Sequence, residues 1–458
     1  MAIDKLGLEF TAALPETVDH FNSAMDDYML FSGEPVGDLL ATAEVDPDFA
    51  LGYCLTGCLR LFGGVGSSHP RVNLELRAAL ARRNRVTPRE QAHIDAFAMA
   101  ATGELNRAGQ MWDAILAEYP HDMMAAKCAH ECYYLVGESG NLKASALAIL
   151  PAWDESIPYY GYLLGMAAFG LEEAGEYRQA EKLGRRAIEI EPRDCWGVHA
   201  VAHVLQMQGR CQEGIAFLDG TANDWQQAVW LRGHLWWHLC LPLIDDGQIE
   251  RVISIYDDHI SDCDKDMVTR LNDCTALLWR LELKGIDVGD RWDRLVDMWS
   301  YHIDEHAFAF ADAHLAMTLV SAGGEKKLGR FLESQHAYIE GDESTNAEII
   351  DRIGRPLCLG MVAFCRGDHE RAAKLIYPIR DQIRRIGGSV AQRDMFRMTL
   401  TEALLRSGRA EDARDMHAPT IEATPTPSGL LDFGRALAAT GDQGAADAAF
   451  DRARAMTT

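Results

Sequence analysis

The chain has 458 residues, of which 48% are hydrophobic and 25% charged, a balance typical of a folded globular protein and unlike that of a disordered chain. Its 69 acidic and 44 basic side chains give a formal net charge of −25. This charge argues against nucleic acid or an anionic membrane as the main partner, because both require a basic surface. The length fits either two or three domains or one extended array of repeats.

The start of the chain is acidic and lacks the apolar stretch behind a basic end that marks a secretory signal. No apolar run approaches the roughly 20 residues needed to span a bilayer. We therefore expect a cytoplasmic protein that does not enter membranes. Its 11 cysteines should be buried thiols, since Cys54/Cys58 and Cys128/Cys132 have helical spacing and not the C-x-x-C spacing of zinc or redox sites.

The first hundred residues already have the pattern of helical units. Residues 46–62 form an apolar stretch with helical periodicity, and 87–103 begin with Thr87, Pro88 and Glu90, a capping box with proline in the first turn. Both segments predict ordinary units of a helical array.

Apolar residues recur at spacings of three and four along the whole chain, and alternating β-branched stretches are hard to find. The turns repeat one signature, a glycine followed five residues later by alanine: Gly103/Ala108, Gly175/Ala180, Gly367/Ala372, Gly408/Ala413 and Gly441/Ala446. A proline follows seventeen residues after three of these glycines, at Pro120, Pro192 and Pro425. The glycines at 103, 137, 175, 209 and 247 are separated by 34, 38, 34 and 38 residues, which is a helix-turn-helix period.

These residues resemble the tetratricopeptide repeat, which has a period of about 34 with glycine, alanine and proline at such places. Residues 164–194 match it well, whereas 110–122 and 403–418 match in part. The resemblance implies an all-α fold, an α-solenoid of degenerate helix-turn-helix repeats with a concave groove. The proline-rich bend at 423–429 should precede a final helix pair that caps the array.

A narrower resemblance covers nearly the whole chain. The segments that carry it, in chain order, are PYYGYLLGMAAFGLEEAGEY, VHAVAHVLQMQGR, HLWWHL, ALLWRLEL, FADAHLAMTLVSAG and IGGSVAQRD. Together they resemble the tetratricopeptide repeat protein 38 family, which has bacterial and animal members. The family has histidine where this chain has Val390, so no role is carried over to that position.

The resemblance implies a single, strongly curved solenoid over residues 1–458. We expect N-terminal helical units over 1–86, central repeats over 87–325, and C-terminal repeats with a cap over 326–458. The resemblance therefore predicts the fold and gives little indication of the activity.

Two histidine pairs in the central repeats are the strongest candidates for a functional site. His199/His203 and His234/His238 each lie four residues apart, so each pair points two imidazoles from one face of a helix. Both pairs precede a turn glycine, on the first helices of consecutive units, and are expected to face one groove. Imidazole is a ligand for zinc, iron or manganese, so the four side chains are candidate ligands of a divalent metal ion. The alternative is that they are buried histidines that order the repeat stack.

Acidic and imidazole side chains on the same expected face are candidate acid–base residues. They are His130 and Glu131 in the preceding units, and Asp312 and His314 downstream. Glu131 and Asp312 are the nearest acidic residues that this register places toward the groove.

Two further residues are candidates for substrate binding. Trp237 belongs to a group of tryptophans that either wall a dry pocket or pack in the core. Arg393 lies near a helix start in IGGSVAQRD, where free N–H groups attract anions, and it either binds a substrate carboxylate or forms a salt bridge in a capping turn.

Two functions remain open at this stage. One is an enzyme acting on a small molecule, with metal-dependent hydrolysis favoured over oxygenation. The other is a scaffold whose groove binds a peptide or protein partner, with structural histidines and no cofactor. Basic residues, which peptide-binding grooves of this repeat class use to hold carboxylates, are sparse here, and this favours the enzyme. A homo-oligomer is compatible with either function.

Overall fold

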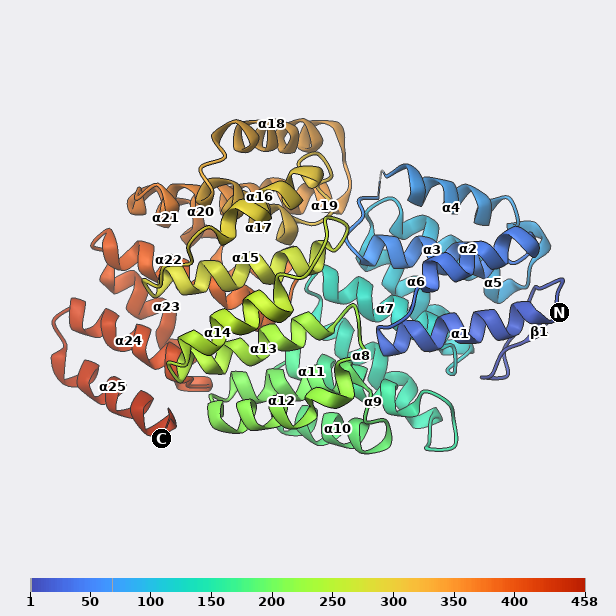
Figure 1. The fold of residues 1–458 in the computed structure, drawn as a ribbon, viewed down its shortest axis with the longest axis horizontal. Coiled ribbons are helices and arrows are strands. Elements are labelled where there is room, and N and C mark those ends of the chain that lie inside the picture. Colours follow the sequence, from blue (N-terminus) through green and yellow to red (C-terminus); the bar gives the residue numbers. More distant parts are fainter. Residues whose placement is uncertain (1, 68, 458) are drawn as a thin grey trace.

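The computed structural model describes residues 2–67 and 69–457 and consists of helix pairs stacked in chain order (Figure 1). The N-terminal part contains β1 (Ala2–Ile3), β2 (Glu9–Phe10), α1 (Glu16–Leu30), α2 (Pro35–Val45), α3 (Ala50–Phe62), α4 (Pro70–Leu80), the 3₁₀ turn η1 (Arg83–Arg85), α5 (Pro88–Ala100), α6 (Leu105–Glu118), α7 (Met123–Leu135), α8 (Ser139–Ile149) and the 3₁₀ turn η2 (Leu150–Ala152).

The central part contains α9 (Tyr160–Glu173), α10 (Tyr177–Ile190), α11 (Cys195–Met207), α12 (Cys211–Trp225), α13 (Arg232–Asp245), α14 (Ile249–Ile255), the π-helical η3 (Tyr256–Ile260), α15 (Val268–Leu283), α16 (Arg291–Trp299), the 3₁₀ turn η4 (Ser300–His302) and α17 (Ala309–Ser321).

The C-terminal part contains α18 (Glu325–Gly341), α19 (Thr345–Ile349), the π-helical η5 (Ile350–Gly354), α20 (Arg355–Cys365), α21 (His369–Ile376), the 3₁₀ helix η6 (Tyr377–Ile386), α22 (Val390–Arg406), α23 (Ala410–Ala423), α24 (Pro427–Ala439) and α25 (Gln443–Thr457). Two outcomes differ from the sequence expectation. The chain begins with a short antiparallel strand pair, and several helices continue as 3₁₀ or π turns.

The turn glycines have the backbone conformation that the repeat register predicts. All five at 103, 137, 175, 209 and 247 have positive φ, between 65° and 83°. Positive φ is unfavourable for residues with a Cβ atom, so glycine ends the first helix of each pair at low cost. The same conformation recurs at Gly285, Gly323, Gly367, Gly408 and Gly441, which extends the period to the end of the chain. The predicted all-α solenoid is therefore confirmed.

The predicted helix ends are confirmed as well. Pro120, Pro192 and Pro425 each follow a helix by two residues, at the ends of α6, α10 and α23. Thr87 and Glu90 form the capping box at the start of α5.

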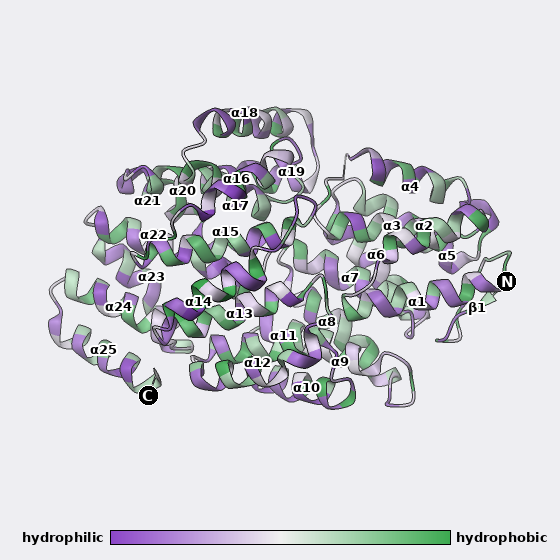
Figure 2. Ribbon diagram, in the orientation of Figure 1, coloured by the Kyte–Doolittle hydropathy of each residue, from purple (hydrophilic) through white to green (hydrophobic). Residues whose placement is uncertain are grey.

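Helices of the central repeats form two layers. In the inner layer, α9 and α11 are buried over almost their whole length, whereas in the outer layer α10 buries only Ala180, Gly184 and Ala187. Purple and green residues accordingly alternate along α10 (Figure 2). The small residues at 184 and 187 let α10 pack closely on α9 and α11. Polar side chains on the inner helices must therefore find their hydrogen-bond partners within the protein.

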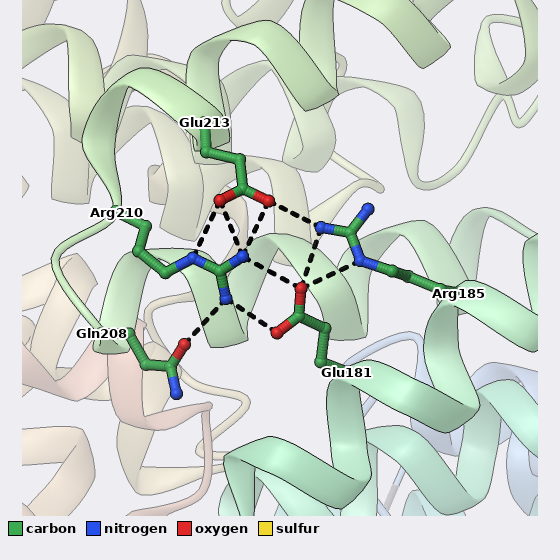
Figure 3. Close-up of polar contacts among 5 residues, drawn as sticks. All are labelled: Glu181, Arg185, Gln208, Arg210 and Glu213. Atoms are coloured by element: carbon green, nitrogen blue, oxygen red, sulfur yellow. Dashed lines mark hydrogen bonds and ion pairs between the residues drawn. The ribbon is translucent and has the colours of Figure 1, made fainter.

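A network of ion pairs connects the outer helices α10 and α12 (Figure 3). Arg210 donates to Glu181 at 2.7 Å and to Glu213 at 2.7 Å, and Arg185 contacts both carboxylates. Gln208 accepts a further bond from Arg210. Hydrogen bonds from Arg210 lower the pKa of the Glu181 carboxyl. These groups are partly exposed, so each pair contributes about 1 kcal/mol at most, but together they fix the register of two consecutive repeats.

The array closes on itself, so that its groove becomes a partly enclosed space. α22 packs against α11 and α15, far earlier in the chain. The Tyr134 hydroxyl on α7 donates to Gln392 at 2.9 Å, and the Thr345 backbone N–H donates to Glu104 at 2.9 Å. On another side, the Trp230 N–H donates to the carbonyl of Phe31 after α1.

Glycines allow two further close approaches between these distant segments. A Cβ at Gly137 would lie 1.8 Å from the carbonyl oxygen of Arg384, and one at Gly387 would lie 2.4 Å from that of Leu135. The backbone of the turn after α7 is therefore in contact with the backbone at the end of η6. Within the part of the chain that the structure describes, no helix is both long and apolar enough to cross a membrane.

Candidate metal centre

Four imidazoles from α11 and α13 meet in the interior; we call them the four-histidine cluster. His199 Nε2 lies 3.0 Å from His203 Nε2 and 3.1 Å from His234 Nε2, and His238 Nε2 lies 3.0 Å from His234 Nε2. One ring nitrogen from each residue lies within 4.8 Å of those of the other three. The convergence predicted from the repeat register is therefore present.

The position of the cluster follows from the local sequence. Each pair is separated by four residues on a helix of the inner layer, so both imidazoles of a pair extend from the same face. α11 and α13 pack against each other, and this brings the two faces together. The side chains are between 0% and 8% exposed.

Burial favours the neutral form of three of these imidazoles, those of His199, His203 and His238. It lowers the pKa of His203 to about 3, and burial together with the neighbouring imidazoles lowers the pKa values of His199 and His238 well below the ordinary value. Neutral imidazole, with a free lone pair on one nitrogen, is the form that binds metal ions.

Two buried carboxylates lie behind the cluster, on the far side of the rings from the centre. Asp273 on α15 accepts from His234 Nδ1 at 2.9 Å, and Oε2 of Glu172 on α9 lies 3.2 Å from His203 Nδ1. The Asp273 carboxylate holds the proton of His234 on Nδ1 and directs the lone pair of Nε2 toward the centre of the cluster. Burial raises the pKa of the Glu172 carboxyl to about 8, and neither of its oxygens has a well-formed hydrogen bond.

The distances within the cluster fit ligation of a single ion. With bonds of about 2.1 Å, neighbouring nitrogens around one ion are separated by about 3.0 Å at right angles and about 3.4 Å in a tetrahedron. The three close Nε2 distances, 3.0 to 3.1 Å, are nearer to the right-angle value. Imidazole ligands suit zinc, iron, copper and nickel, and right-angle arrangements are formed by several of these ions.

A cavity of about 200 Å³ adjoins the cluster; we call it the central cavity. Its walls come from the end of α1, the end of α3, α7, α11, the start of α13, α15, the start of α17 and the turn before α22. His199, His234 and Asp273 line it, whereas His203 and His238 lie behind them. An ion at the cluster would therefore face the cavity through two of its four ligands.

The predicted acid–base residues on α7 lie near the central cavity. Glu131 lines the cavity and pairs with Lys127. His130 Nε2 accepts from Trp196 Nε1 at 3.1 Å, so this imidazole supports a tryptophan of the cavity wall. Burial lowers the pKa of His130 well below its ordinary value.

The two downstream candidates do not line the cavity. Asp312 contacts His306 at 3.1 Å and Gln335 at 2.8 Å, and His314 Nδ1 donates to the carbonyl of Phe310 at 2.7 Å. The expectation that Glu131 and Asp312 are the acidic groups nearest to the histidines is therefore wrong, because Asp273 and Glu172 contact them directly. Catalytic roles for all four candidates stay predictions.

The two residues predicted to bind substrate lie within the protein framework. Trp237 is fully buried and stacks on His234, with ring centroids 5.4 Å apart and an interplanar angle of 8°. Arg393 pairs with Glu173 at 3.1 Å, beside the capping box of Ser389 at the start of α22. Neither is among the residues lining the central cavity, and their binding roles stay predictions.

Sequence reasoning missed Asp273 and Glu172. Asp273 precedes the turn glycine Gly285 by twelve residues, much as His234 precedes Gly247 by thirteen. Extending the repeat register by one unit would have placed this carboxylate beside the cluster. Glu172 has no comparable signal, because it occupies the last turn of α9, where acidic residues are commonly exposed.

Comparison with known proteins adds a likeness of fold only. No protein-family model matches the chain. The chain is similar to the human IFIT1 dimer with PPP-AAAA, at 13% identity and a TM-score of 0.43, covering 100% of this chain and 98% of that one. It is also similar to the P58(IPK) TPR domain, at 13% identity, a TM-score of 0.22 and coverages of 81% and 98%.

A third similar structure is the APC/C hetero-tetramer Cut9–Hcn1, at 12% identity, a TM-score of 0.25 and coverages of 96% and 96%. At these values none of the three likenesses supports a functional argument. By its own architecture, with repeated helix pairs and positive-φ turn glycines, the chain is a tetratricopeptide-like helical-repeat protein.

Proposed function

We propose that this protein is a metal-dependent enzyme that acts on a small molecule in the central cavity. The observation that carries the proposal is the convergence of four Nε2 atoms beside that cavity, two of them from residues that line it. His199, His203, His234 and His238 are the proposed ligands of one divalent transition-metal ion.

The number of hydrogen bonds that the Nε2 atoms can form favours a metal site over a purely structural cluster. Each Nε2 carries either one N–H or one lone pair in the ring plane, so it can form one strong hydrogen bond. The Nε2 atoms of His199 and His234 each face two neighbours at 3.0 to 3.1 Å. Without a metal, each of these two Nε2 atoms would have to share its one hydrogen bond between two neighbours. A cation at the centre would instead bind the lone pairs of all four Nε2 atoms. The proton of His234 is then on Nδ1, where Asp273 accepts it.

Hydrolysis is the proposed reaction class, ahead of oxygenation. A divalent ion with an open position lowers the pKa of bound water toward neutrality and thereby supplies hydroxide as a nucleophile. Glu131 on the cavity wall is the proposed acid–base residue, since it lines the same cavity as His199 and His234.

Metal analysis of protein purified without a histidine tag tests the proposal. We expect about one ion per chain and its loss in the His199→Ala, His238→Ala double variant. His314→Ala is the matched control, because His314 is equally buried but lies outside the cluster. Wild-type protein that stays free of metal after incubation with zinc, iron, manganese, copper or nickel would refute the proposal.

We further propose membership of the tetratricopeptide repeat protein 38 family, a cytoplasmic location, and the division at residues 86 and 325. The family assignment is supported by the six sequence segments that carry the resemblance. The acidic net charge supports a small-molecule substrate over a nucleic acid.

A further inference from the structure

The wall of the central cavity is rich in aromatic side chains and poor in basic ones. Eight of its 25 lining residues are phenylalanine, tyrosine or tryptophan: Tyr28, Phe31, Phe62, Tyr134, Trp196, Trp230, Phe308 and Phe310. Among the described residues that line it there is no lysine or arginine. Sites for phosphates or for free carboxylates usually supply such cations, so these groups lack a charged partner here away from the metal centre.

Cationic ligands are disfavoured for a different reason. Lys127 lies behind the wall, and its ammonium is within 4.6 Å of the Phe31 ring centroid and 5.0 Å of that of Trp196. A buried ammonium already occupies the attractive field of these rings. It also pairs with Glu131, the acidic residue on that side of the cavity. A cationic ligand would find the Glu131 carboxylate already paired and would be repelled by the Lys127 ammonium.

Three buried polar atoms of lining residues have no hydrogen-bond partner among the described residues. They are the Tyr28 hydroxyl, Asn272 Oδ1 and His199 Nδ1. Buried polar groups are almost always hydrogen-bonded, so these atoms indicate where a ligand or a water supplies the missing bond. An uncharged ligand with one or two polar groups meets that requirement.

The size of the cavity limits the ligand further. A cavity of about 150 Å³ lined by apolar side chains binds benzene, and the central cavity measures about 200 Å³. Gly63 and Thr269 are exposed lining residues, so the cavity reaches the surface between the end of α3 and the start of α15. A molecule with one or two rings can enter there and reach His199 and His234.

We infer that the substrate is an uncharged aromatic molecule of one or two rings, with a polar group directed at the four-histidine cluster. The inference rests on the proposed function in treating the central cavity as the substrate site. The aromatic wall holds the rings by stacking and excludes water from the reacting group.

Calorimetric titration with 2-naphthol and 2-naphthyl phosphate tests the inference, because the two probes share one ring system and differ in charge. The titrations use metal-free and zinc-loaded protein. We expect 2-naphthol to bind both forms with a Kd in the micromolar range, and the phosphate to bind the metal-free form at least about tenfold more weakly. Equal or tighter binding of the phosphate by the metal-free form would overturn the inference.

Variants that fill the cavity show whether binding occurs there. Ala311→Phe places a ring in the cavity, and Thr269→Trp obstructs its exposed end without entering the core. Each should weaken 2-naphthol binding by about tenfold or more while leaving the metal content unchanged. Unchanged binding in both variants would overturn the inference.

The zinc content of the same samples separates this inference from the proposed function. Binding of 2-naphthol by protein that takes up no zinc would refute the metal function and leave the ligand class standing. Stoichiometric zinc without binding of 2-naphthol would refute the ligand class alone.

Discussion

Replacing Asp273 with asparagine should weaken metal binding without removing a ligand. The Asp273 carboxylate accepts from His234 Nδ1 at 2.9 Å and thereby directs the Nε2 lone pair toward the centre of the cluster. An asparagine amide can donate to Nδ1 instead, which favours the tautomer with its proton on Nε2, where the metal binds. Loss of such an outer partner typically costs 10- to 100-fold in affinity, or about 1.4 to 2.7 kcal/mol.

The matched control is Asp312→Asn. Asp312 is 3% exposed and Asp273 is 2% exposed, and both contact an imidazole Nδ1, but the partner of Asp312 is His306, outside the cluster. Both variants should lose similar stability, and Asp273→Asn alone should lose zinc affinity in a competition with a chelator. Equal losses of affinity, or an Asp273→Asn affinity within twofold of wild type, would refute the assigned role of the carboxylate.

Two further predictions concern closure of the array and acid stability. Gly137→Ala should unfold at a lower temperature than Gly175→Ala: both glycines have positive φ, at a cost of about 1 to 2 kcal/mol for alanine, but only at Gly137 would the new Cβ meet a carbonyl, that of Arg384. Equal melting temperatures would contradict the contact. Burial and the charge of Arg397 lower the pKa of His417 to about 3, below its value of about 6.5 in the unfolded chain. The unfolded state therefore binds the extra proton, and stability falls by up to about 1.4 kcal/mol per pH unit as the pH drops from 6.5 toward 3. Urea unfolding between pH 6.5 and 4.5 should show a shallower loss for His417→Gln, and an unchanged slope would contradict the prediction.

The helical repeat was predictable because its determinants are local. Each turn needs a residue that tolerates positive φ, and glycine at 103, 175 and 209 meets this need within a few residues of sequence. Convergence of the histidine pairs was predictable for the same reason, since consecutive units repeat one geometry. The register sufficed to place the two histidine pairs on one groove face, although it was not used to find Asp273.

Closure of the array was beyond local reasoning. The bond from Tyr134 to Gln392 joins residues 258 positions apart, and Thr345 contacts Glu104 across 241 positions. No periodic sequence pattern predicts such contacts, because they depend on small rotations between repeats that add up over the whole array. The sequence therefore predicted a groove, and the enclosed cavity and its aromatic wall follow from the way the distant segments meet.

Closure also explains why the polar chemistry is concentrated on the inner helices. In an open array the groove faces of α11, α13 and α15 would be solvated, and water would satisfy their imidazoles and carboxylates. In the closed array these faces are buried, and a buried polar group without a partner costs about 1 to 3 kcal/mol. The Nδ1 atoms of His199 and His238 are such groups here. A fold that needed only packing would be more stable with apolar residues at these positions, so this cost supports the proposed binding role of the same two imidazoles, through their Nε2 atoms.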